Sequence, residues 1–180
     1  AGNLLGPEQS GHIAAVGIET YLTMLDETVR ELRGEAVEDV PSASIDLPVA
    51  TAIPQSYISD ASVRLEIYRR VAAGETPADQ LLEELRDRFG QPPAEIRSLI
   101  ELSSLKRLAE SLRVQAISVS GIDLQIRLRR DAGIDVERLI RLVSTRDGAA
   151  FSPSGVLSLR RGGGADMLAL AMRTLEELSA

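Results

Sequence analysis

The chain of 180 residues contains no cysteine and only one histidine, His12. Disulfides, thiol nucleophiles and thiolate metal sites are therefore excluded, and one imidazole does not make a zinc site. His12 is also far in sequence from every cluster of carboxylates, so a Ser-His-Asp centre is not indicated. We expect neither a catalytic residue nor a metal site.

Long apolar runs are missing as well. No stretch approaches the roughly 20 apolar residues that span a bilayer. Residues 1–30 lack the basic start and apolar centre of a signal peptide. We expect a cytoplasmic protein without a membrane partner.

Positive charge is scarce. Lysine and arginine number 20 against 27 aspartates and glutamates, for a net charge of −7. A phosphate backbone repels such a chain, so nucleic-acid binding is disfavoured. The alternative of a nucleic-acid-binding module stays open because arginines occur in adjacent pairs, although solvated faces explain these pairs more simply. The pairs are Arg69 with Arg70, Arg129 with Arg130, and Arg160 with Arg161.

The chain is predicted to consist of two pieces. Residues 17–33 have the apolar spacing of an amphipathic helix, which Gly34 ends. Residues 34–45 are acidic, rich in small side chains and interrupted by Pro41, as in a linker. The remaining residues, 46–180, form the larger piece. With 180 residues and 44% hydrophobic content, the chain as a whole can bury one core, or one core with a small appendage.

Helical patterns dominate the first half of the larger piece. Asp60 and Gly74 are typical of the two ends of a helix over residues 61–73. A second helix is predicted over 77–89, with Thr76 as its N-cap and the proline after it as the first helical residue. The longest helix follows Pro92 and Pro93, and its apolar face consists of Ile96, Leu99, Ile100, Leu105, Leu108, Ala109 and Leu112.

Strand patterns are shorter. Residues 45–49 alternate, and Pro48 confines that strand to the edge or the end of a sheet. Residues 114–130 predict a hairpin around Gly121, with four inward side chains: Ile122, Leu124, Ile126 and Leu128. Further elements are a hairpin over 149–160 and helices over 135–144 and 165–179. The predicted fold class is α+β, with helices packed on a small, mainly antiparallel sheet and a separate N-terminal helix before them.

Motifs of catalytic sites are weak in this sequence. RRGGGAD at 160–166 precedes a helix but lacks the G-K-[ST] ending of a phosphate-binding loop, so we interpret it as a flexible loop. Glu83, Glu84 and Asp87 resemble an acid/base pair of carboxylates, which leaves a small enzyme as a second alternative. A solvated helix face explains them more simply, since no pocket is indicated beside them.

Five short sequences follow one another along the chain: AGNLLGPEQSGHIAAVG, YLTML, RLEIYRRVA, LLEELRDRFGQPP and LIELSSLKRLA. In their order and spacing they resemble the C-terminal end of the bacterial transcription-repair coupling factors, the Mfd family, and the resemblance covers essentially the whole chain. The resemblance implies that residues 1–33 are the tail of a translocation module. Residues 34–45 are then a linker, and residues 46–180 a C-terminal regulatory domain.

The opening segment resembles the loop of the family's translocation motif, which relays ATP-driven motion to DNA. Gln9 takes the position of the loop glutamine, with Gly6 and Gly11 on either side. The resemblance implies that the motor lobes, with their ATP and magnesium sites and their DNA contacts, lie before Ala1. We therefore expect this chain to need no cofactor, to hydrolyse no ATP and to contact no DNA.

In the family, the C-terminal domain packs against a domain similar to the damage-verification protein UvrB. It thereby masks the surface that recruits UvrA, and it restrains the motor until RNA polymerase is engaged. The resemblance implies the same autoinhibitory role here and places EELRDRFG at the masking interface. The expected contact residues are Glu84, Asp87 and Arg88, with both carboxylates facing outward to accept arginines of the UvrB-like domain. The simpler alternative is that Asp87 pairs with a local arginine, Arg88 or Arg64.

Overall fold

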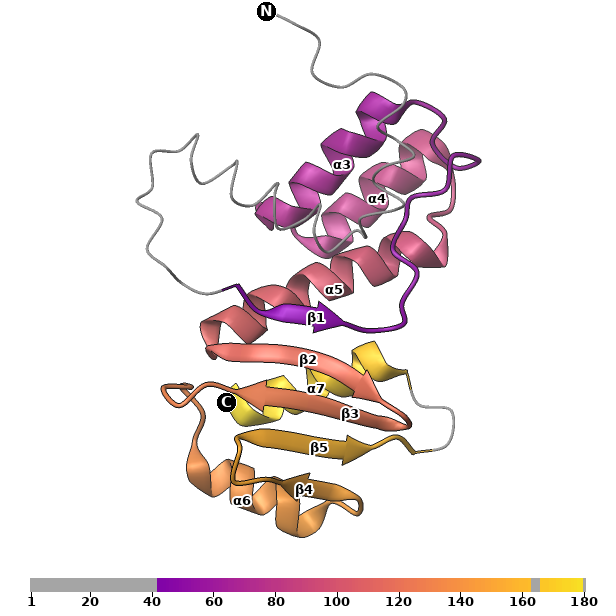
Figure 1. Cartoon of the computed structure of the whole chain (residues 1–180). Helices are drawn as coiled ribbons and strands as arrows, with labels where there is room; N and C mark the ends of the chain where they lie inside the picture. The colour runs from indigo at the N-terminus through magenta and orange to yellow at the C-terminus, as the bar shows by residue number, and fades with distance from the viewer. Residues whose placement is uncertain (1–41, 163–165, 180) are drawn as a thin grey trace, which may run out of the picture. The chain divides into compact units, whose positions relative to one another are not determined.

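The computed structural model describes residues 42–162 and 166–179 (Figure 1). The predicted N-terminal helix and residues 34–41 of the predicted linker lie outside this part. The described residues form five helices and a five-stranded, mostly antiparallel sheet, which confirms the α+β class. They divide into two compact units, one built from residues 50–100 and the other from residues 42–49 and from 101 onward.

The first unit is helical. It contains α3 (Ala61–Ala73), α4 (Ala78–Phe89) and the beginning of α5 (Ala94–Ser111). Asp60 caps α3 through its side chain, and Gly74 ends α3 with a φ of 64°, in the left-handed region, as predicted. The buried core of this first unit consists of Ile53, Ile58, Ile67, Tyr68, Val71, Leu81, Leu85, Ile96, Leu99 and Ile100.

The start of α4 differs by one residue from the prediction. Pro77 has a ψ of 140°, which is extended backbone, so it precedes the helix as the cap residue. Its carbonyl already accepts the first helical hydrogen bond, from the N–H of Leu81 at 3.0 Å. The prediction of Thr76 as N-cap is therefore wrong, and no side chain caps this helix.

The second unit is built on the sheet, whose strand order is β1-β2-β3-β5-β4. β1 (Ser44–Asp46) pairs in parallel with β2 (Val114–Ser120), and all other pairs are antiparallel. The remaining strands are β3 (Asp123–Leu128), β4 (Ala149–Phe151) and β5 (Val156–Arg160). The end of α5, together with α6 (Val136–Thr145) and α7 (Met167–Ser179), completes the unit, with α6 beside β4 (Figure 1).

Two details of the sheet depend on local chemistry. β1 is an edge strand, as Pro48 predicts, but it ends at Asp46, because the proline has no N–H with which to continue the pairing. It also includes Ser44 and Ile45, the last two residues of the predicted linker. The inward position predicted for Ile122 is wrong: this side chain is 61% exposed, because it lies in the turn between β2 and β3.

The long helix α5 serves two cores. Ile96 and Leu99 are buried in the first unit, whereas Leu105 and Ala109 are buried in the second. The apolar face of α5 is thus predicted correctly, but it does not belong to one core. Which half joins which core depends on the elements that pack against it.

Candidate interdomain interface on helix α4

Helix α4 exposes the residues that the sequence marks as an interface. Its apolar residues recur every three or four positions, so Leu81 and Leu85 are buried while the opposite side reaches solvent. Asp87 and Arg88 are exposed, and the side chain of Glu84 is 34% exposed. These three residues therefore lie on the accessible side of one helix.

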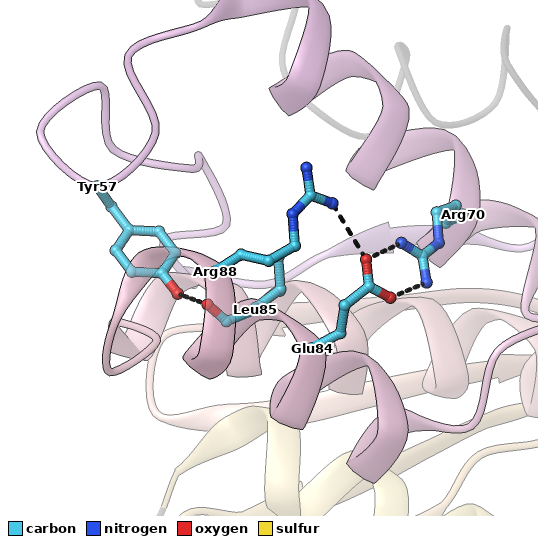
Figure 2. Close-up of polar contacts among 5 residues, drawn as sticks. All are labelled: Tyr57, Arg70, Glu84, Leu85 and Arg88. Atoms are coloured by element: carbon cyan, nitrogen blue, oxygen red, sulfur yellow. Dashed lines mark hydrogen bonds and ion pairs between the residues drawn. The ribbon is translucent and has the colours of Figure 1, made fainter.

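Glu84 is held by two arginines of its own unit (Figure 2). Its two carboxylate oxygens accept hydrogen bonds from Arg70 of α3, at 2.8 Å from Nη1 and 2.6 Å from Nη2. Arg88, one turn later on α4, donates a third bond at 3.2 Å. Glu84 therefore already has local partners, contrary to the expectation that it faces outward to await an arginine of another domain.

The same contacts fix the protonation state of Glu84. The hydrogen bond from Arg70 lowers the pKa of this carboxyl from 4.5 to about 2, against the opposing effect of burial and with help from the charges of Arg70 and Arg88. The bond also raises the pKa of Arg70. A catalytic acid needs a raised pKa instead. The lowered pKa of Glu84 and its hydrogen bonds from two arginines thus argue against the alternative of a small enzyme with Glu84 as its catalytic acid.

Asp87 is in a different situation. Within residues 42–162 and 166–179 its side chain makes no hydrogen bond and no ion pair. Arg64, one of the two local arginines proposed for it, donates to the backbone carbonyls of Ile58 and Ser59 at 2.7 and 2.9 Å. The other, Arg88, bonds Glu84, and its guanidinium lies 5.0 Å from the centre of the adjacent phenylalanine ring. Asp87 keeps its acceptor sites open to solvent.

Tyr57 fixes the C-terminal end of α4 (Figure 2). Its hydroxyl lies 3.1 Å from the carbonyl oxygen of Leu85 and 2.8 Å from that of Gly90. Its ring packs edge-on against Phe89, with 6.1 Å between the ring centres. The hydroxyl thus bonds the carbonyl of the C-cap residue Gly90, which lies past the last helical turn, and ties it to the last turn of α4. Sequence reasoning missed Tyr57, because 28 residues separate it from Leu85 and no local pattern joins them.

The other predicted site residues are not brought to this surface. Gly6, Gln9 and Gly11 lie outside the described residues. Of the arginine pairs, Arg70 is engaged by Glu84, and Nε of Arg160 lies 3.8 Å from a carboxylate oxygen of Asp123.

Two other properties of residues 42–162 and 166–179 bear on metal binding and membrane insertion. No group of three or more His, Cys, Asp or Glu side chains there is arranged to hold a metal ion. No helix there has the length and apolar character needed to cross a membrane.

Comparison with known proteins gives one consistent answer. A model of the TRCF domain matches residues 47–139. The transcription-repair-coupling factor of Myxococcus xanthus is 35% identical over 185 residues, which is 99% of this chain and 15% of that protein. The Haemophilus influenzae factor is 35% identical over 79% of this chain, and the Staphylococcus aureus factor is 35% identical over 78%. The chain spans 13% of each of these two relatives.

A solved structure shares the fold. The crystal structure of the C-terminal domain of a transcription-repair coupling factor superposes with a TM-score of 0.59 at 20% identity, over 77% of this chain and 96% of that one. At this identity the likeness concerns the fold alone. The match to the TRCF domain model over more than half of this chain shows that the chain belongs to the transcription-repair coupling factor family.

Proposed function

We propose that this chain acts as an autoinhibitory lid on the UvrB-like domain of a transcription-repair coupling factor. In that role it masks the surface that recruits UvrA and restrains the motor until RNA polymerase is engaged. The chain performs no chemistry itself; ATP, magnesium and DNA are handled by the motor of the parent protein. The observation that carries the proposal is the exposed carboxylate of Asp87, which has no partner in the described part of the chain.

Asp87 and Arg88 offer opposite charges side by side. A partner surface with an arginine opposite Asp87 gains a charge-assisted contact, which is geometrically specific because guanidinium and carboxylate bond as two forks. Once such a pair is desolvated, loss of one member costs on the order of 2 to 5 kcal/mol. In water the same carboxylate contributes almost nothing, so its value depends on the partner.

Glu84 supports this contact from inside the unit. Its fork with Arg70 ties α4 to α3, so the side that carries Asp87 is in place before a partner arrives. A surface that is ordered in advance loses less conformational entropy on binding. We therefore assign Glu84 a positioning role and Asp87 the direct contact.

The test is the affinity of the 180-residue chain for the isolated UvrB-like domain. Asp87→Lys should weaken binding by about tenfold or more, which corresponds to at least about 1.4 kcal/mol. The matched control is Asp147→Lys, which makes the same charge change at an exposed residue of the second unit and should leave affinity within about twofold. Circular dichroism should show both variants folded.

Changing Glu84 and Asp87 together to lysine is less informative. Glu84→Lys would also break the fork with Arg70, so weaker binding by the double variant could reflect a displaced helix. In the parent protein, Asp87→Lys alone should raise ATP turnover without RNA polymerase and should expose the UvrA-binding surface. Equal affinity of the Asp87→Lys chain and the unchanged chain would place the lid contact on another face.

A further inference from the structure

Helix α6, in the second unit, carries an apolar stripe that its own unit does not cover. Leu139 and Leu142 are buried in the core, whereas Val136 is 65% exposed and Ile140 is 60% exposed. Residues four apart lie on the same side of a helix, one turn from each other. The stripe therefore faces solvent beside the buried side of α6.

Phe151, which is 41% exposed, is a further exposed apolar side chain of the same unit, on strand β4 beside α6. β4 is the outermost strand, and Phe151 pairs with the buried Leu157, so both side chains lie on the face that the helices cover. α6 and β4 pack together and are joined by residues 146–148 alone, so they run antiparallel (Figure 1). A strand rises about 3.3 Å per residue and a helix about 1.5 Å per residue, so two steps along β4 from Ala149 span the same length as about four steps back along α6 from Thr145. Phe151 is therefore at about the level of Ile140.

Two opposite charges border the stripe. Glu137 and Arg141 are exposed and lie one turn apart, on the solvent side of Val136 and Ile140. Neither side chain makes an ion pair within the described residues. The ion pair at this end of α6 is formed instead by Arg138 and the N-cap residue Asp135, at 3.6 Å. When two copies of this helix lie antiparallel with their apolar stripes in contact, the negative residue of each copy lies beside the positive residue of the other. The stripe and its two charges are therefore complementary to a second copy of the same helix.

We propose that Val136, Ile140 and Phe151, the α6 patch, bind a second copy of this chain through antiparallel contact of the two α6 helices. With a two-fold axis at the level of residues 138–139, Val136 of one copy meets Ile140 of the second copy. Glu137 then lies beside Arg141 of the second copy, and symmetry repeats every contact. The patch is small against the roughly 800 Å² that each partner buries in a standard interface, so the dimer is weak, with a Kd of about 0.01 to 1 mM.

Sedimentation equilibrium of the 180-residue chain tests the proposal. Between about 10 μM and 1 mM, the average mass should rise from that of one chain toward that of two. Ile140→Glu puts a charge at the centre of the contact and should raise the Kd by about tenfold or more. Ile122→Glu is the matched control, because Ile122 is equally exposed, at 61%, but lies in the turn between β2 and β3. It should leave the Kd unchanged.

Charge reversal tests the pairing itself. Glu137→Arg brings two arginines together across the axis, and Arg141→Glu brings two glutamates together, so each single variant should weaken association. The double variant restores opposite charges and should regain the original Kd. A chain that stays monomeric at 1 mM, an equal loss with Ile122→Glu, or a double variant no better than the single ones would overturn the proposal.

Discussion

Replacing Glu84 by glutamine should destabilise the first unit, because the change keeps the size of the side chain but removes the charge from the fork with Arg70. The lowering of the Glu84 pKa from 4.5 to about 2 would correspond to about 3 kcal/mol without solvent screening. The Glu84 side chain is 34% exposed and that of Arg70 is 28% exposed, so screening reduces this value. We expect a loss of ~1 kcal/mol in the free energy of unfolding at pH 7.

Urea unfolding followed by the near-ultraviolet tyrosine signal is a suitable assay, since two of the three tyrosines, Tyr57 and Tyr68, belong to this unit. Glu83→Gln is the control, because Glu83 is an exposed neighbour on the same helix. Equal midpoints for the two variants at pH 7 would refute the stabilising role of the fork.

The pH dependence gives a second check on the same pair. Because the folded-state pKa of Glu84 is lowered, its contribution is fully present above about pH 4.5 and is lost as the pH falls toward about 2. The stability difference between the unchanged chain and Glu84→Gln should therefore shrink across this window. A difference that stays constant from pH 7 to pH 2 would contradict the assignment.

Three further predictions concern stability, each measured by chemical denaturation. Tyr68→Phe removes the acceptor 2.7 Å from the buried N–H of Ile53 and should cost about 1 to 3 kcal/mol, whereas an unchanged midpoint would mean that another group satisfies this N–H. Asp60→Ala removes the cap of α3 and should cost about 1 kcal/mol, with Asp60→Asn, which keeps a capping oxygen, as its control. Arg113→Gly should stabilise by about 1 kcal/mol, because Arg113 has a φ of 54°. Arg113→Ala keeps that backbone strain and should show no gain.

The candidate interface was only partly predictable. The spacing of Leu81 and Leu85 by itself places Asp87 and Arg88 on the exposed side of α4, and the four-residue spacing of Glu84 and Arg88 is a visible signal of their contact. The partner that matters most for Glu84 is Arg70, which lies 14 residues earlier on another helix. No periodic pattern links two helices across a turn, so the sequence could not show that this carboxylate is already engaged.

The sequence by itself determined the elements whose signals are local. Asp60 and Gly74 fix the two ends of α3 through hydrogen bonds and backbone freedom that involve only their neighbours in sequence. Only the tertiary structure decided how the apolar face of α5 is shared between two cores, and that Ile122 lies in a turn, exposed to solvent. The physical reason is that spacing along the chain selects which side of an element is apolar. What covers that side depends on contacts between residues far apart in sequence, and those form only when the elements pack.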